Sequence, residues 1–148
     1  PEGSLVFLDP KKSFINFNQC DIITPNLNEL KLLSGNNIIS EEDIKESCEI
    51  ILKKYNLKYI IAKRGDEGIT IIGNNDYVKH LKARFVETPD VTGAGDTVIS
   101  SISLAFAATN DIEKSAKFAI NASALAVSKP GTATVTIDEI NNYINANE

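Results

Sequence analysis

The segment Asp90–Asp96, which reads DVTGAGD, holds residue types that phosphoryl transfer to an alcohol requires. Gly93 and Gly95 lack side chains, so the backbone N–H groups there can approach an anion closely. An apolar helix is predicted to begin near Asp96, and its free N–H groups and positive dipole end would stabilise a phosphoryl group. A carboxylate at the same point could accept the proton of an attacking hydroxyl. The segment is therefore a candidate catalytic turn.

A purely structural alternative exists for this segment. Gly-Ala-Gly is also typical of a flexible turn, and an Asp at the start of a helix is a common N-cap. The segment is not a P-loop, because the pattern GxxxxGK[ST] is absent, and GxGxxG fails because Val98 stands at its last position. Taken alone, the pattern favours the structural alternative.

Two further turns follow predicted strands and change this balance. Asn26 and Glu29 are three residues apart, which places both on one face of a helix, where they could hold a hydrated Mg²⁺ and its phosphates. The alternative is that Glu29 only stabilises the helix N-terminus. The second turn, Lys63–Gly68, reads KRGDEG and brings two cations and two glycines to a strand end, although an ordinary charged turn would have the same composition.

The elements that must position these turns alternate between strands and helices. Buried strands are predicted over 5–8, 21–24 and 59–62, a hairpin over 69–72 and 77–81, and helices over 26–33, from Ser40, over 97–108, over 112–127 and from Thr136. The helices over 97–108 and 112–127 carry so little charge that we expect each to be buried on more than one side. This order predicts an α/β fold with a largely parallel sheet, in which ligands bind at the carboxyl ends of strands.

Composition narrows the class of function. The chain of 148 residues is 43% hydrophobic with a net charge of −5, which fits one folded domain and argues against nucleic-acid binding. No apolar run is long enough to span a bilayer, so we expect no membrane partner. His80 is the only histidine, which excludes HExxH and Cys₂His₂ metal sites. Cys20 and Cys48 are interpreted as two reduced thiols in a cytoplasmic protein.

The motifs together resemble those of the ribokinase-like, or PfkB, carbohydrate kinases. DVTGAGD resembles the second signature of that family, TPNLNEL its Asn-x-x-Glu motif, and KRGDEG its nucleotide-contacting loop. The segment Lys117–Thr132 is similar to the Ala-rich helix and turn that flank the adenine and a monovalent cation. Order and spacing agree over nearly the whole chain. LDPKK and PGTATV add a likeness to the kinase domain of the bacterial heptose-phosphate kinase/ADP-heptose synthases.

The resemblance implies a three-layer α/β/α sandwich that uses ATP, Mg²⁺ and a K⁺-type ion. Asp96 would be the catalytic base, and the N–H groups of Gly93, Ala94 and Gly95 would form the anion hole. The remaining implied site residues are Asn26 and Glu29 for Mg²⁺ and phosphates, Lys63, Gly65 and Gly68 for the nucleotide, Asn121 near adenine, and Asp90, Thr92, Ala126, Lys129 and Gly131 around the monovalent cation. Many relatives carry the adenine-side Asn one position earlier, where this chain has Ile120, so the sequence departs from the family at that contact.

The family also implies a larger protein. Its members are about twice this length, so we expect residues 1–148 to be the carboxyl-terminal, nucleotide-binding and catalytic portion of one kinase domain, a fragment of a homodimeric parent. The parent would phosphorylate the anomeric hydroxyl of a heptose 7-phosphate for ADP-heptose and lipopolysaccharide precursor synthesis. The alternatives are a kinase of ribose, fructose, fructose 1-phosphate or a nucleoside, and, in another class, a nucleotide-binding module without catalysis. The activity of the isolated chain, and a following nucleotidyltransferase domain, stay open.

Overall fold

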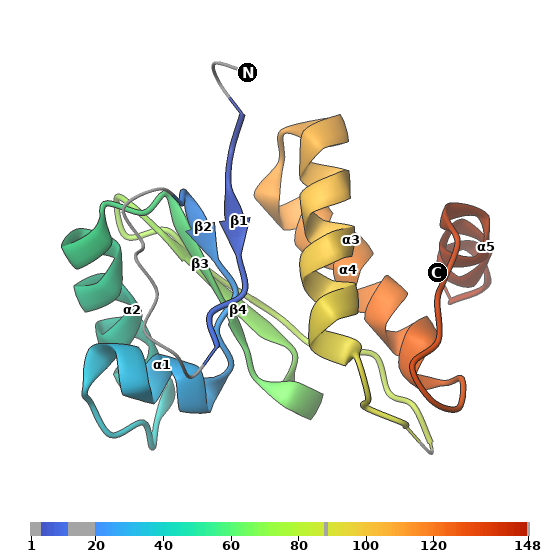
Figure 1. The fold of residues 1–148 in the computed structure, drawn as a ribbon, viewed down its shortest axis with the longest axis horizontal. Coiled ribbons are helices and arrows are strands. Elements are labelled where there is room, and N and C mark those ends of the chain that lie inside the picture. The colour runs from blue at the N-terminus through green and yellow to red at the C-terminus, as the bar shows by residue number, and fades with distance from the viewer. Residues whose placement is uncertain (1–3, 12–19, 88, 148) are drawn as a thin grey trace. The chain divides into compact units, whose positions relative to one another are not determined.

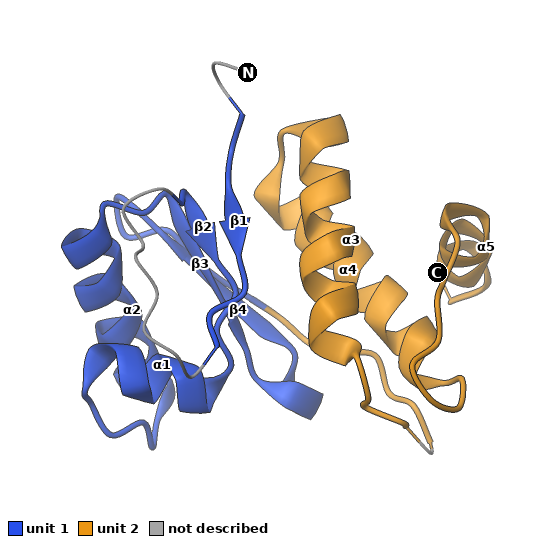
Figure 2. Cartoon of the chain, viewed as in Figure 1, with its two compact units in different colours: residues 1–80 blue, residues 81–148 orange. Residues whose placement is uncertain are grey.

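The computed structural model describes residues 4–11, 20–87 and 89–147. Lys12, the last residue of the LDPKK motif, lies outside the described residues. The chain divides into two compact units, residues 1–80 and residues 81–148, which are described separately (Figure 2). Among the described residues, no helix combines the length and the apolar character needed to cross a bilayer.

The first unit is built on a mixed sheet whose strands follow the order of the chain. The strands are β1 (Phe7–Leu8), β2 (Ile22–Ile23), β3 (Tyr59–Lys63), β4 (Ile69–Gly73) and β5 (Val78–Leu81), in the order β1-β2-β3-β4-β5 (Figure 1). β1, β2 and β3 are parallel, and β4 returns antiparallel to β3 with Lys63 paired to Ile69. The predicted parallel strands and the predicted hairpin are therefore both present. The carboxyl ends of β1, β2 and β3 meet at one edge.

Two helices, α1 (Leu27–Ser34) and α2 (Glu41–Tyr55), lie on the same side of this sheet (Figure 1). Their apolar faces join the strands in a core that includes Ile23, Leu30, Ile44, Ile51 and Ile60. Each helix begins at a capping box and ends at a residue in the left-handed region. The two helices lie where the sequence predicts helices over 26–33 and from Ser40, because N-terminal capping depends on neighbours three residues apart.

The second unit is a set of three helices, α3 (Ala94–Thr109), α4 (Ile112–Val127) and α5 (Ile137–Asn147). α3 packs against α4, and α4 packs against α5. The expectation of burial on more than one side holds for α4, in which eight residues are buried, most of them alanines. It is wrong for α3, which buries only Ser101 and Ile102 among its described residues.

Candidate active site

The α3 turn places Asp96 differently from a capping residue. The N-cap of α3 is Gly93, whose φ of 78° lies in the left-handed region, and Asp96 is the third residue of the helix. The helix start has no side-chain cap, and the exposed Asp96 carboxylate bonds to none of the described residues. The prediction that Asp96 could serve as the N-cap is therefore wrong. Its carboxylate is left free at the positive end of a helix.

Backbone donors surround this start of α3. The N–H groups of Gly93 and Gly95 donate to none of the described residues, as expected for the first turn of a helix. The Ala94 N–H is directed at the carbonyl of Val91, at a distance of 3.2 Å. Two of the three predicted anion-hole donors are thus available without rearrangement, and the third has a competing partner.

The Asp90 carboxylate joins the loop before α3 to the loop after α4. Its Oδ2 accepts the N–H of Gly131 at 2.7 Å, and its Oδ1 accepts the N–H of Thr92 at 3.1 Å. The Asp90 N–H donates to the carbonyl of Val127 at 2.8 Å. Hydrogen bonds from Thr92 and then from the Gly131 N–H lower the pKa of Asp90 below its ordinary value. Three of the residues predicted around a monovalent cation, Asp90, Thr92 and Gly131, therefore lie together, and the ionised carboxylate of Asp90 joins their two loops.

The other two predicted cation-site residues lie on the loop after α4. The Ala126 carbonyl accepts the N–H of Lys129 at 3.1 Å. The Lys129 ammonium binds Glu139 at 2.7 Å and the carbonyl of Thr134 at 3.3 Å. Glu139 also completes the capping box of α5 with Thr136. The Lys129 side chain therefore ties this loop to α5 and is engaged there.

The Lys129–Glu139 ion pair makes the stability of the second unit depend on pH. Lys129, and then the backbone N–H of Thr136, lower the pKa of Glu139 from 4.5 to about 2. Because the folded pKa is depressed, the stabilisation is present above about pH 4.5 and is lost as the pH falls toward about 2. Glu139→Gln is expected to lower the free energy of unfolding at pH 7, with a difference from the wild type that shrinks over this range. Urea denaturation at several pH values measures it, and a pH-independent difference would contradict the assignment.

Asn121 lies on α4 and is already engaged within the second unit. Its Oδ1 accepts the Nε–H of Arg84 at 3.1 Å, and its Nδ2 donates to the carbonyl of Lys117 at 2.8 Å. The side chain of this residue is buried, with 7% of the residue exposed. An adenine contact by this amide would therefore require the Arg84 bond to open.

In the first unit, Asn26 and Glu29 form the capping box of α1. The Asn26 Oδ1 accepts the Glu29 N–H at 2.9 Å, and a Glu29 carboxylate oxygen accepts the Asn26 N–H at 2.7 Å. The helix-terminal alternative for Glu29 is thus present in the structure. The second carboxylate oxygen of Glu29 bonds to none of the described residues. One free oxygen suits a Mg²⁺ ion that keeps most of its waters.

Lys63 ends β3 beside this capping box. Its backbone N–H donates to the carbonyl of Pro25 at 2.8 Å, and Asn26 pairs with it in a parallel bridge. Its ammonium donates to Asp9 at 2.5 Å, and Asp9 also accepts the hydroxyl of Thr24 at 3.0 Å. No site role was predicted for Asp9 of LDPKK or for Thr24 of TPNLNEL, although each stands directly after a strand.

The rest of the Lys63 loop is a short 3₁₀ turn, Gly65–Glu67, closed by the Arg64 N–H on the Gly68 carbonyl at 2.8 Å. The Arg64 side chain is only 7% exposed. It binds Glu41 at the start of α2 and Glu67 of the turn, so it holds the loop in place. Of the two cations in KRGDEG, Arg64 is therefore structural and Lys63 faces the carboxyl ends of the parallel strands.

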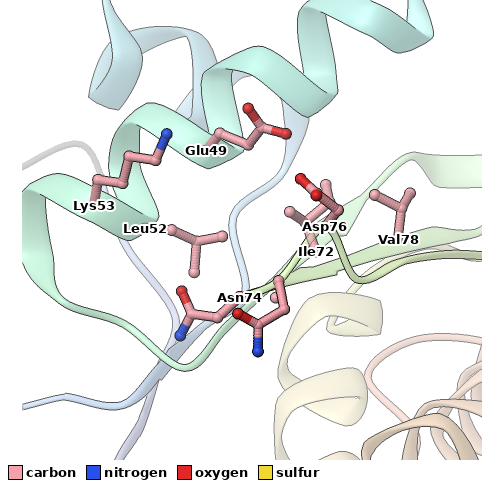
Figure 3. Close-up of a pocket in the computed structure, with 9 residues that line it drawn as sticks. Glu49, Leu52, Lys53, Ile72, Asn74, Asp76 and Val78 are labelled. Carbon is pink, nitrogen blue, oxygen red and sulfur yellow. The ribbon is translucent and has the colours of Figure 1, made fainter.

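One pocket of about 90 Å³ lies at the other end of the sheet. Glu49, Leu52 and Lys53 of α2 face Asn74 and Asp76 of the turn between β4 and β5, as Figure 3 shows. Because Tyr59 pairs with Gly73, this turn lies beside the amino end of β3. The pocket contains none of the predicted site residues.

This chain is similar to a known protein family over most of its length. The pattern of the pfkB family carbohydrate kinases matches residues 4–139. The chain is 36% identical over 140 residues to the Bifunctional protein HldE of Shewanella baltica strain OS185. The aligned residues cover 94% of this chain and 29% of that protein. It is 32% identical over 140 residues to the Bifunctional protein HldE of Syntrophotalea carbinolica, again over 29% of that protein. The chain thus spans less than a third of the length of these curated relatives.

Solved structures give the same result for the fold. The ribokinase of Thermotoga maritima superposes with a TM-score of 0.86 at 25% identity, over 97% of this chain and 50% of that one. A ribokinase II from E. coli in complex with ATP and Mg²⁺ gives a TM-score of 0.72 at 28% identity, over 88% of this chain and 41% of that one. The predicted ribokinase-like α/β fold is confirmed. With its family pattern extending over residues 4–139, the chain belongs to the pfkB family of carbohydrate kinases.

Proposed function

We propose that this chain is the nucleotide-binding and catalytic portion of an ATP-dependent carbohydrate kinase. The observation that carries the proposal is the start of α3. There, the exposed carboxylate of Asp96 and the N–H groups of Gly93 and Gly95 have no partner among the described residues. A general base and anion-binding donors at one helix start are the parts that phosphoryl transfer to an alcohol requires.

In the proposed reaction, Asp96 accepts the proton of a sugar hydroxyl. The sugar oxygen then forms a bond to the γ-phosphorus of ATP, while the bond from that phosphorus to the β–γ bridging oxygen breaks and ADP leaves. The N–H groups at Gly93 and Gly95 donate to the oxygens of the transferred group, on which negative charge is spread. Ala94 joins them if its N–H leaves the carbonyl of Val91.

The first unit is proposed to hold the nucleotide and its metal. Asn26 and the free oxygen of Glu29 would bind water ligands of Mg²⁺, which when bound neutralises charge on the β- and γ-phosphates. The backbone of Lys63 and the turn between Gly65 and Gly68 would line the nucleotide. The E. coli ribokinase II structure in complex with ATP and Mg²⁺ supports the choice of ATP and Mg²⁺ as the bound molecule and ion.

A K⁺-type ion is proposed for the loops that Asp90 joins. The lowered pKa of Asp90 keeps a negative charge there, and its bonds already bring Thr92 and Gly131 to it. An ionised carboxylate with backbone carbonyls nearby is a donor set that a hard cation prefers. Ala126 and Lys129 would contribute through their backbones. Asn121 would reach adenine only after leaving Arg84.

The proposed substrate is heptose 7-phosphate, phosphorylated at its anomeric hydroxyl in the synthesis of ADP-heptose and lipopolysaccharide precursors. The HldE relatives support this choice among carbohydrate kinases. The proposed parent is a cytoplasmic homodimer.

Calorimetry of this chain with ATP·Mg²⁺ tests the proposal, together with a phosphorylation assay of the chain and of its full-length parent. The assay uses a panel of heptose 7-phosphate, ribose, fructose, fructose 1-phosphate and a nucleoside. We expect micromolar to millimolar nucleotide binding and turnover of the heptose phosphate. Turnover of another sugar alone would replace the substrate. Binding without any turnover would favour a nucleotide-binding module, and no binding would contradict a kinase role.

A further inference from the structure

The carboxyl ends of three parallel strands bring together an acid, a hydroxyl and a base. Asp9 follows β1, Thr24 follows β2 and Lys63 ends β3. Because β2 lies between β1 and β3, the Lys63 side chain reaches across the end of β2 to Asp9. Thr24 donates to the same carboxylate oxygen as Lys63, at 3.0 Å and 2.5 Å respectively. The three residues form one hydrogen-bonded cluster, the strand-end cluster.

This cluster is nearly closed to solvent. The side chains of Asp9 and Lys63 are 9% and 14% exposed, and Thr24 is fully buried. The other oxygen of Asp9 binds Lys11 at 2.6 Å, on a side chain that is 63% exposed. Burial would raise the pKa of Asp9, but the hydrogen bonds from Lys11 and Lys63 outweigh it and hold the pKa below its ordinary value. Asp9 therefore stays ionised in this nearly closed setting.

The opposite ends of β2 and β3 carry a comparable ion pair that is more exposed to solvent. Asp21 precedes β2, Lys58 precedes β3, and they bind at 3.0 Å with 27% and 55% of their side chains exposed. A buried ion pair loses more hydration than an exposed one, so a buried pair contributes little net stability. Joining the strands therefore does not require a buried pair, and the strand-end cluster calls for another explanation.

We propose that Asp9 withholds the Lys63 ammonium from anions, so that nucleotide binding at this edge depends on a divalent cation carried by the phosphates. The inference rests on the proposed function in one respect, namely that phosphates approach the capping box of Asn26 and Glu29. Lys63 lies beside that box through its bridge with Asn26. A free lysine there would bind metal-free nucleotide directly, and Asp9 removes that option.

The test compares metal-free ATP, ATP·Mg²⁺ and inorganic triphosphate by calorimetry on the wild-type chain and its variants. Asp9→Asn removes the charge that holds Lys63 and leaves only a weaker amide acceptor. The affinity of this variant for metal-free ATP and triphosphate is therefore expected to rise about tenfold, the size of one charged hydrogen bond. Adding Lys63→Met to Asp9→Asn is expected to abolish the gain. Adding Lys11→Met instead is expected to retain it, because Lys11 is already exposed. Asp21→Asn, which frees Lys58 at the far end of the strands, is the matched control and is expected to show no gain.

The outcomes separate this inference from the proposed function. The inference alone would be overturned if the wild type binds ATP·Mg²⁺ and the Asp9→Asn variant gains no affinity for any of the three ligands. It would also be overturned if the variant loses affinity for all three, since a loss means that Asp9 positions Lys63 for phosphate. Wild type that binds no nucleotide would overturn the proposed function and the inference with it.

If the Asp9→Asn variant does not fold, a measurement on the wild type tests the same inference. The nuclear magnetic resonance signal of the Lys63 ammonium is expected to stay unchanged when ATP·Mg²⁺ binds, because its bond to Asp9 persists. A shift of that signal in step with nucleotide binding would show that Lys63 turns to the phosphates, and would contradict the inference.

Discussion

In the full-length parent protein, Asp96→Asn is expected to lower kcat for sugar phosphorylation by about a thousandfold, within the range that general-base catalysis contributes. The amide keeps the shape of the carboxylate but cannot accept the proton of the attacking hydroxyl. The KM for ATP is expected to change little, because no role in nucleotide binding is proposed for Asp96. Steady-state kinetics with the sugar that the panel identifies measure both constants.

The structure makes this test cleaner than the sequence alone would. Gly93 is the N-cap of α3, and the Asp96 carboxylate bonds to none of the described residues, so the variant loses no cap. Its melting temperature is therefore expected to stay within a few degrees of the wild type. Asp138→Asn changes an exposed acid in the first turn of α5 and is the matched control, with kcat expected to be unchanged. Near-normal turnover by Asp96→Asn would contradict its role as the base.

Local signals explain why much of the fold could be predicted. Ser40 and Asn26 cap their helices through bonds to residues three positions on, and Gly35 ends α1 in the left-handed region. The short apolar runs ending at Leu8 and Ile23 form neighbouring parallel strands, of which the second is fully buried and the first only partly buried. These features depend on a few adjacent residues, which a sequence displays directly.

The candidate site was predicted less completely, because its contacts join distant parts of the chain. Asp9 and Lys63 are 54 positions apart, and only the order of the strands brings them together. The contact between Asp90 and Gly131 spans 41 positions in the same way. The N-cap of α3 was misplaced, since the helix starts where the backbone of Gly93 enters the left-handed region, a feature that a Gly-Ala-Gly sequence does not fix.

Gly93→Ala is expected to cost both stability and activity, for reasons that can be separated. Gly93 has a φ of 78°, which side chains disfavour by about 1–2 kcal/mol. An added Cβ would also lie 3.0 Å from the Cγ2 of Thr132, so the Thr132 side chain or the α3 turn must give by a few tenths of an ångström. Relief of the backbone strain at this φ is expected to move the N–H donors of the α3 turn. Loss of an anion-hole donor lowers kcat by about a hundredfold to a thousandfold, and kinetics with urea denaturation measure both effects.

Gly35→Ala separates backbone strain from chemistry. Gly35 has nearly the same φ, 76°, and an added Cβ there would meet nothing within 4 Å. It ends α1, at the opposite end from Asn26, so its variant is expected to lose about 1 kcal/mol of stability while keeping kcat. Equal losses of kcat in the two variants would mean that lowered stability explains both. A loss confined to Gly93→Ala would tie catalysis to the backbone of the α3 turn. Of the two glycines, only Gly93 precedes N–H groups and a carboxylate that bond to none of the described residues.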